Sequence, residues 1–290
     1  MLYKAHGLGN DYLVLELAEF VGALTPPAVR ALCDRHRGVG SDGVLAAVPS
    51  SVAEFGVRIF NPDGSEAEKS GNGLRIFGAY LYRGARVALG QEFRVETLGG
   101  VVSMRVLAES ADGVMEVEVE MGTARFGSAA VGLRGPDRYA DGEVLELEAG
   151  DTLAITPVSL GNPHCVVFTD TLDVEDLRRR GPQISTHPWF ENGTNVQFAR
   201  VAEPGVLEAL VWERGAGETE ASGSSACAVA AAALHRGLVV ERTLAVRMPG
   251  GVLEVEVRED WSVRLRGPVE DVFRASLTEG MRGRIMNVEF

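Results

Sequence analysis

The chain contains little lysine. Of its 28 basic residues, two are lysines, Lys4 and Lys69, and the others are arginines. Enzymes that use pyridoxal phosphate need a lysine to form the Schiff base, so this sequence supplies that chemistry poorly.

Cysteine and paired histidines are scarce as well. Cys33, Cys165 and Cys227 are an odd number without CxxC spacing, and the five histidines form no HxxxH pair. These patterns disfavour a disulfide framework and a zinc site. We therefore expect no metal.

Positive charge is also in short supply, because 41 acidic residues give a formal net charge of −13. No basic cluster is dense enough to line a groove, so we expect no nucleic-acid partner. The longest basic run, Arg178 to Arg180, precedes Gly181-Pro182 and predicts the last turn of a surface helix.

Long apolar runs are missing too. None approaches the roughly 18 residues of a membrane span, and the first residues lack the pattern of a signal peptide. We expect a cytoplasmic protein that has no membrane partner.

The sequence is rich in internal similarity. The triplet LGN occurs at Leu8 to Asn10 and again at Leu160 to Asn162, 152 residues later. At the same offset, SEAEKSG at 65–71 matches GETEASG at 217–223, so that Ser70 corresponds to Ser222. Two further pairs, YRG with HRG and GGVVSMRV with GGVLEVEV, keep the same order and nearly the same spacing. The repeat predicts a duplicated domain.

Each half has the same predicted layout. A strand follows the LGN triplet, a second strand leads into a glycine-rich loop and a helix, and a hairpin comes next. The two helices, predicted near residues 71–84 and 223–237, are apolar on most sides, which is typical of a helix buried all round.

We therefore expect an α/β (α+β) fold of two pseudo-symmetric lobes, each a partly closed β-barrel wrapped around a central α-helix. The N-terminal lobe is expected at 1–120 plus 269–290 and the C-terminal lobe at 121–268, with the active site in the cleft between them.

The loops before the two helices, SGNG and SGSS, predict an anion site. A helix N-terminus presents free N–H groups, and glycines let the backbone approach a ligand closely. One such loop alone favours a simple tight turn, but two loops related by a repeat favour binding. Because neither GxGxxG nor GxxxxGK[ST] is present, a carboxylate fits better than a phosphate.

A proton carrier at each helix start would allow two-base inversion at a carbon beside the bound carboxylate. Glu213 and His164 are candidates to orient or tune these carriers, and Arg214 can hold a second carboxylate. Plainer interpretations stay open. Asn61 lies in a turn-like FNPDG, His164 fits a core histidine, and Glu213 with Arg214 fits a surface pair.

Five segments carry a resemblance to a known family: HGLGNDYLVL, FNPDGSEAEKSGNGLR, GNPHCVVF, TNVQFARV and WERGAGETEASGSSACA. In order and spacing they resemble the motifs of diaminopimelate epimerase, from about Leu2 to past Gly251. This family belongs with proline racemase and the hydroxyproline epimerases. The resemblance implies two barrel-like lobes, no cofactor, epimerisation of LL- to meso-diaminopimelate, and a homodimer as in many members.

The resemblance also assigns residues. The proton-transfer positions are Ser70 and Ser222, supported by Glu213 and His164. Arg214 with Asn61, Asn162 and Asn195 would hold the distal end of the substrate. The substrate-binding positions are Asn10, Asn61, Gly71, Asn72, Asn162, Asn195, Glu213, Arg214, Gly223 and Ser224.

The sequence departs from the family at both proton-transfer positions, where the family has cysteine and this chain has serine. A thiol with a pKa of about 8.5 can be tuned to act near neutral pH, whereas a hydroxyl is a far weaker acid. A difference of roughly five pKa units corresponds to about 7 kcal/mol, and a helix dipole supplies only about 0.3–2 kcal/mol. Ser225 is a further departure, because the family favours a small residue such as glycine there.

Three hypotheses follow. The chain is a diaminopimelate epimerase whose activity is weak or was removed by exchange of cysteine for serine. Alternatively it is a paralogue with other chemistry, such as hydroxyproline epimerisation or dehydration, or a silent amino-acid-binding protein. The complete set of asparagines with Arg214 favours the first hypothesis and a dicarboxylic amino acid as the ligand, while Ser225 favours natural divergence.

Overall fold

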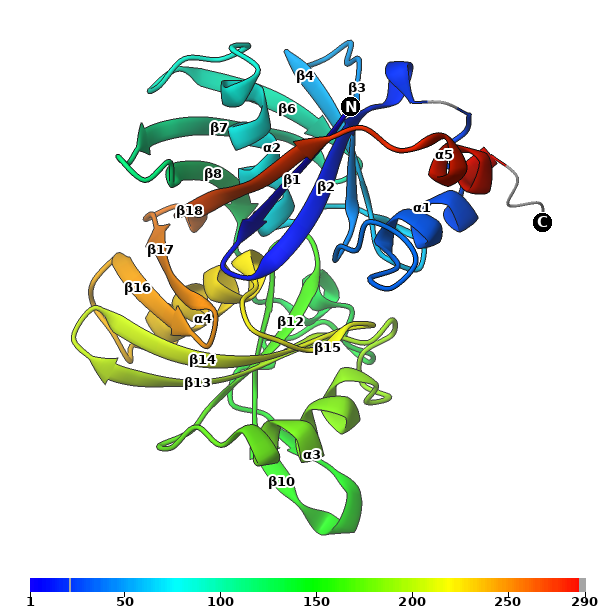
Figure 1. Cartoon of the computed structure of the whole chain (residues 1–290). Helices are drawn as coiled ribbons and strands as arrows, with labels where there is room; N and C mark the ends of the chain where they lie inside the picture. Colours follow the sequence, from blue (N-terminus) through cyan, green and yellow to red (C-terminus); the bar gives the residue numbers. More distant parts are fainter. Residues whose placement is uncertain (21, 287–290) are drawn as a thin grey trace. The chain divides into compact units, whose positions relative to one another are not determined.

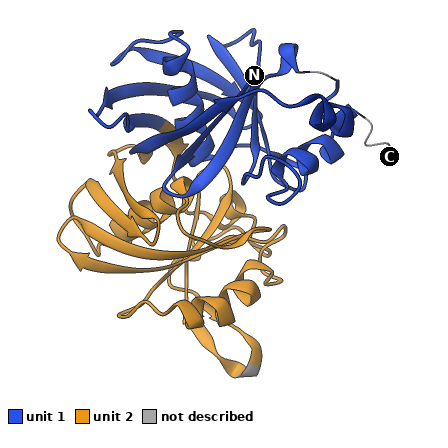
Figure 2. Ribbon diagram, in the orientation of Figure 1, with its two compact units in different colours: residues 1–119, 267–290 blue, residues 120–266 orange. Residues whose placement is uncertain are grey.

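The computed structural model describes residues 1–20 and 22–286. The chain forms two compact units, which Figure 2 colours separately. Unit 1 comprises Met1–Val119 and Gly267–Phe290, and unit 2 comprises Glu120–Arg266. Unit 2 is therefore inserted into the sequence of unit 1.

The strands of unit 1 close into a ring of eight, in the order β1-β2-β3-β4-β6-β7-β8-β18, with β18 pairing back to β1. The short β5 (Glu66–Ala67) pairs with β4. The ring consists of β1 (Leu2–Gly7), β2 (Asn10–Glu16), β3 (Val44–Val48), β4 (Phe55–Phe60), β6 (Glu92–Thr97), β7 (Gly100–Glu109), β8 (Met115–Thr123) and β18 (Ser262–Ala275).

The helix α2 (Gly71–Arg83) is the central helix of this ring, and Figure 1 shows it among the strands of unit 1. Ten of its thirteen residues are buried, including Leu74, Ile76 and Phe77, and it contacts β1, β2 and β7. Gly78 lets the strands come close, because a Cβ there would lie 3.1 Å from the Cε of Met104. Burial on several sides is what the apolar pattern predicted.

A smaller layer lies outside the ring, where α1 (Pro26–Cys33) contacts α5 (Glu279–Met286). Their buried side chains, among them Val29, Leu32 and Ile285, share one hydrophobic cluster with Leu13 of β2. This layer ties the last described helix to the first strands of the chain.

Unit 2 repeats the plan with a curved sheet in the order β18-β17-β16-β14-β13-β12-β11, to which β15 adds along β14. A separate hairpin pairs β9 with β10. The bounds are β9 (Val144–Glu146), β10 (Thr152–Ala154), β11 (Thr156–Ser159), β12 (Pro163–Phe168), β13 (Asn195–Glu203), β14 (Val206–Glu213), β15 (Gly217–Thr219), β16 (Thr243–Met248) and β17 (Gly251–Val257).

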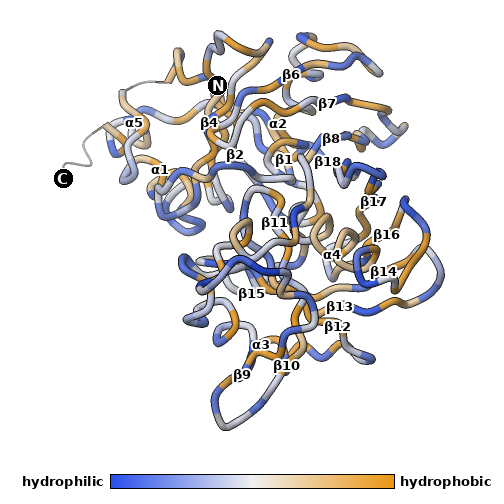
Figure 3. Tube along the Cα trace, turned by 180° about the vertical axis from the view of Figure 1, so that it is seen from behind, coloured by the Kyte–Doolittle hydropathy of each residue, from blue (hydrophilic) through white to orange (hydrophobic). Residues whose placement is uncertain are grey.

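The central helix of unit 2 is α4 (Gly223–His235), and every residue from Ala226 to Ala233 is fully buried. It contacts β11, β12, β13, β14, β16 and β17, so the sheet curves around it. Figure 3 shows the hydrophobic character of this helix. The predicted fold, two similar lobes that each wrap strands around one central helix, is confirmed.

The helix α3 (Val174–Ser185) corrects one expectation. It does not end at Gly181-Pro182 but continues to Ser185, so Arg178 to Arg180 lie in its middle. Leu177 and Ile184 are buried in the core cluster of unit 2, and this burial favours the longer helix despite the proline. The three arginines pair with neighbouring carboxylates, for example Arg180 Nε with Asp151 at 2.8 Å.

Three short 3₁₀ segments complete the structure: η1 (Leu17–Glu19), η2 (Ser128–Val131) and η3 (Glu148–Gly150). Within residues 1–20 and 22–286, no helix is both long and apolar enough to cross a membrane.

Candidate active site

The two serines singled out by the repeat occupy equivalent positions at the starts of α2 and α4. Ser70 has φ −138° and ψ 119°, and Ser222 has φ −140° and ψ 122°. Each is the N-cap of its helix. Ser70 Oγ accepts a hydrogen bond from the Gly73 N–H at 3.0 Å, and Ser222 Oγ accepts one from the Ser225 N–H at 3.5 Å. Each hydroxyl therefore satisfies one of the free N–H groups of its helix start.

We call the α2 start and its neighbours half-site 1, defined by Tyr12, Asn10, Ser70, Gly71 and Asn72. The structure brings the two predicted asparagines together here, because Asn72 Nδ2 donates to Asn10 Oδ1 at 3.0 Å. Each of these two amides also makes a hydrogen bond with a charged side chain.

The supports of these amides are charged side chains. Arg75 Nη2 donates to Asn72 Oδ1 at 3.0 Å, and Asn10 Nδ2 donates to Asp42 Oδ2 at 3.0 Å. Arg75 is fully buried and Asn72 is 3% exposed. The geometry of this cluster holds Asn10 and Asn72 in single orientations.

A network of ion pairs anchors the outer end of the cluster. Arg35 Nη2 lies 2.7 Å from both Asp11 Oδ1 and Asp42 Oδ1, and Lys4 Nζ lies 2.8 Å from Asp11 Oδ2. Burial acts to raise the pKa of Asp11, but the hydrogen bonds and charges of Arg35 and Lys4 outweigh it and hold the pKa below its usual value. Asp11 therefore stays charged and keeps the turn after β1 in place.

Tyr12 is a residue of half-site 1 that the sequence analysis missed. Its Oη lies 3.2 Å from Ser70 Oγ, and the residue is only 7% exposed. The repeat contained the signal, since LGNDY at 8–12 aligns with LGNPH at 160–164 and places Tyr12 opposite His164.

We call the α4 start and its neighbours half-site 2. It contains the predicted residues Asn162, His164, Ser222, Gly223 and Ser224, together with Gln197 and Ser225. His164 is fully buried, with Nε2 3.1 Å from Asn162 Oδ1 and Nδ1 3.0 Å from Gln197 Nε2. The same Gln197 nitrogen donates to Ser225 Oγ at 2.9 Å.

This chain of contacts fixes the state of the histidine. Because the Gln197 amide donates to Nδ1, the ring hydrogen lies on Nε2 and donates to Asn162. Burial, with a smaller contribution from the charge of Arg214, lowers the pKa of His164 to about 3, so the ring is neutral at neutral pH. Ser225, the unexplained departure in the sequence, is buried and contacts Gln197.

Asn195, Glu213 and Arg214 lie at the ends of β13 and β14. Asn195 Nδ2 donates to the Pro163 carbonyl at 3.1 Å, and its Oδ1 accepts from the Arg214 N–H at 2.9 Å. The exposed Arg214 side chain donates from Nη1 to the Asn192 carbonyl at 2.9 Å. Glu213 is half-buried and pairs with Gly217 of β15 through the strand backbone.

Asn61 directly follows the last residue of β4, Phe60. Its Nδ2 donates to Ser65 Oγ at 3.0 Å, and its backbone N–H and C=O both make turn hydrogen bonds. It therefore has the turn role that its FNPDG context suggested.

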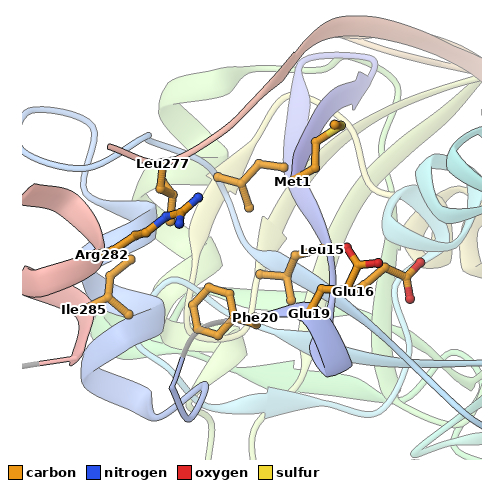
Figure 4. A pocket seen from close by; sticks show the side chains of 9 residues that line it. Met1, Leu15, Glu16, Glu19, Phe20, Leu277, Arg282 and Ile285 are labelled. Carbon is orange, nitrogen blue, oxygen red and sulfur yellow. The ribbon is translucent and has the colours of Figure 1, made fainter. Parts of the chain in front are cut away.

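A pocket of about 50 Å³ lies elsewhere in unit 1, beside α5 (Figure 4). Its lining includes Leu15, Phe20, Leu277 and Ile285 with the charged Glu16 and Arg282. It contains none of the predicted site residues.

Comparison with known sequences points to one family. A family model described as diaminopimelate epimerase matches residues 2–127 and 156–271. The chain is 41% identical over 277 residues to "Diaminopimelate epimerase 2" of a Nostoc species, with 95% of each protein covered. It is 44% identical over 278 residues to the diaminopimelate epimerase of Desulforudis audaxviator, covering 93% of this chain and 96% of that protein.

Solved structures share the fold at low identity. A hydroxyproline epimerase from Agrobacterium vitis, with bound trans-4-hydroxy-L-proline, has a TM-score of 0.67 at 14% identity and covers 94% of this chain and 90% of its own. A methylitaconate-delta-isomerase has a TM-score of 0.64 at 12% identity and covers 100% of this chain and 97% of its own. These likenesses concern the fold alone.

Proposed function

Because the chain belongs to the diaminopimelate epimerase family, and so to the isomerases, we propose that it inverts one α-carbon of a dicarboxylic diamino acid, converting LL- to meso-diaminopimelate. The observation that carries the proposal is the pair of matched serines, which cap α2 and α4 with nearly identical backbone geometry. Two equivalent groups are what a two-base inversion requires.

In this proposal the substrate carboxylate beside the reacting carbon is bound by the N–H groups at Gly71-Asn72 and Gly223-Ser224. These groups stabilise the negative charge that develops when the α-proton leaves. Ser70 and Ser222 act on opposite faces of the carbon, one taking a proton and the other returning one, with no cofactor.

The remaining residues bind and orient. Arg214, whose guanidinium has one nitrogen on the Asn192 carbonyl, holds the distal carboxylate with its fork. His164 donates to Asn162 Oδ1, and this leaves the Asn162 amide hydrogens to face the substrate. We propose that Asn61 and Asn195 add contacts to the distal end and that Glu213 tunes proton transfer.

The serines make this chemistry slow. A hydroxyl lies roughly five pKa units above a thiol, which is equivalent to about 7 kcal/mol in the free energy of forming the base. We therefore propose that the chain binds diaminopimelate but exchanges its α-proton much more slowly than a cysteine enzyme does.

The test restores the thiols. We expect Ser70→Cys with Ser222→Cys to raise α-proton exchange of diaminopimelate in D₂O by at least ~100-fold over the chain as given, because a thiolate forms near neutral pH. The control is Ser224→Cys, which puts a thiol in the same loop but not at the N-cap.

Calorimetry with diaminopimelate separates the outcomes. A double variant that binds the substrate but exchanges no proton shows that the serines do not limit the rate. Absence of binding to both the double variant and the original chain rejects diaminopimelate as the substrate.

A further inference from the structure

Tyr12 and His164 are equivalent positions at which the two half-sites differ, and they stand 152 residues apart like the two serines. We infer that Tyr12 is the proton partner of Ser70, exchanging a proton with its hydroxyl during the reaction. This inference rests on the proposed function and names how one of the two serines can work.

The first observation behind this inference is the contact between Tyr12 and Ser70. Tyr12 Oη lies 3.2 Å from Ser70 Oγ, within hydrogen-bond distance, and either atom can donate. On its other side, Ser70 Oγ accepts the Gly73 N–H at 3.0 Å. Ser70 Oγ therefore contacts both a backbone N–H and the Tyr12 phenol. These two contacts restrict the directions in which the Ser70 hydroxyl hydrogen can point.

The phenol is held in place by its surroundings. Tyr12 is 7% exposed, and its strand β2 pairs with β3, which begins directly after Gly43. A Cβ at Gly43 would lie 2.6 Å from Tyr12 Cε1 and 2.5 Å from the Phe60 carbonyl oxygen. The ring occupies space that only glycine leaves open, so its position at Ser70 is built into the barrel.

The Tyr12 phenol can compensate for the weak acidity of the Ser70 hydroxyl. An ordinary phenol has a pKa of about 10, several units below that of a serine hydroxyl. Tyr12 first loses its own proton to solvent and becomes a phenolate. When Ser70 Oγ then takes the α-proton from carbon, the hydrogen that Oγ already carries passes to the phenolate oxygen. In the reverse direction the phenol returns that hydrogen to Oγ as Oγ protonates the carbanion. One proton moves at each bond, and no oxidant or other co-reactant is needed.

Half-site 2 is arranged differently. The ring nitrogens of His164 contact Asn162 Oδ1 and Gln197 Nε2, so the imidazole holds a substrate-binding amide in place. Ser222 Oγ is the N-cap acceptor for Ser225. At these equivalent positions, Tyr12 exchanges a proton with Ser70 in half-site 1, whereas His164 holds Asn162 in place in half-site 2.

The experiment uses four full-length chains that all carry Ser222→Cys, so that the second proton carrier is constant. They combine Ser70 or Ser70→Cys with Tyr12 or Tyr12→Phe, and α-proton exchange of diaminopimelate in D₂O is measured against pH. With Ser70, we expect Tyr12→Phe to lower exchange by ~10-fold or more and to remove the rise of rate toward pH 10. With Ser70→Cys, whose thiol ionises by itself, we expect a change of less than ~3-fold.

Equal losses in the two backgrounds would overturn the inference, since a merely structural phenol matters to both. Full exchange in the Ser70→Cys, Tyr12→Phe chain would also show that Tyr12→Phe folds. A chain with Ser70 that keeps its alkaline rise after Tyr12→Phe likewise overturns it.

A second measurement does not depend on activity. In protein labelled with ¹³C at tyrosine Cζ, the Tyr12 signal is identified by its loss in Tyr12→Phe. We expect this signal to move in Ser70→Ala, and an unmoved signal rules out the pair in solution. If no chain exchanges protons, including the one with both thiols, the proposed function fails, and this signal still decides whether the pair exists.

Discussion

The hydroxyl oxygens of Ser70 and Ser222 each have two roles. Each one caps a helix, and each one takes part in the proposed chemistry. As N-caps, these hydroxyls satisfy the Gly73 and Ser225 N–H groups, and serine is among the best residues for that role. Cysteine is a weaker cap. The thiols restored in the proposed test therefore gain acidity but lose part of the capping energy, typically about 1 kcal/mol for each helix.

His164 links this local chemistry to the pH dependence of stability. Unfolded, the imidazole binds a proton near pH 6.5, whereas burial and the Arg214 charge hold its pKa in the folded protein at about 3. Between these values the unfolded state carries one more proton. The free energy of unfolding should thus fall by roughly 1.4 kcal/mol for each pH unit below about 6.5.

Urea unfolding between about pH 4.5 and pH 7 measures this slope. We expect His164→Asn to be less stable overall and to lack this part of the slope, whereas the exposed control His36→Asn keeps it. Parallel curves for the original chain and His164→Asn would contradict the assignment.

Sequence alone could identify residues that the repeat duplicates, such as Ser70 with Ser222 and Asn10 with Asn162. It could not identify Gln197, because its partners depend on strand pairing. Parallel pairing of β12 with β13 brings Gln197 beside His164, 33 residues away, and Ser225 reaches it from a helix. Such contacts leave no periodic pattern in the chain.

Among the elements, α3 shows how packing outweighs a stop signal. Gly181-Pro182 resembles a helix end, yet a Cβ at Gly181 would lie 3.0 Å from the Trp212 side chain. The glycine permits close packing on β14, and Ile184 beyond it is buried. By contrast, α2 and α4 were predictable because their apolar residues repeat around the whole helix.

The proline inside α3 leads to an expected gain in stability. Pro182 lacks the N–H that would bond to the Arg178 carbonyl, and its ring disfavours the turn before it. We expect Pro182→Ala to raise the free energy of unfolding by about 1–3 kcal/mol, seen as a higher midpoint in thermal unfolding. Pro136→Ala, in an exposed loop, is the control and should give no gain. A lower midpoint for Pro182→Ala would mean that the helix depends on the proline.

For the molecule as a whole, the insertion of one unit into the other allows a direct test of independence. Unit 2 is one continuous stretch, Glu120–Arg266, and the residues of one hydrophobic core cluster, among them Leu177, Ile184 and Val196, all lie inside it. We expect this fragment to unfold cooperatively in urea with the far-UV spectrum of a β-rich fold. The same fragment with Val196→Asp, which buries a charge in that cluster, should not fold. A non-cooperative transition of the unaltered fragment would show that unit 2 needs unit 1.

The pairing of β1 with β18 has a mechanical consequence. The strands are antiparallel, with Leu2 opposite Ala275 and His6 opposite Glu270, so the outer ends of both strands lie at the same end of the ladder. Force applied to the two termini would therefore open this ladder one pair at a time, as a zipper opens, and would not shear all its hydrogen bonds together. Under tension unit 1 would therefore unfold first. The force would reach unit 2 only after the strands of unit 1 had separated.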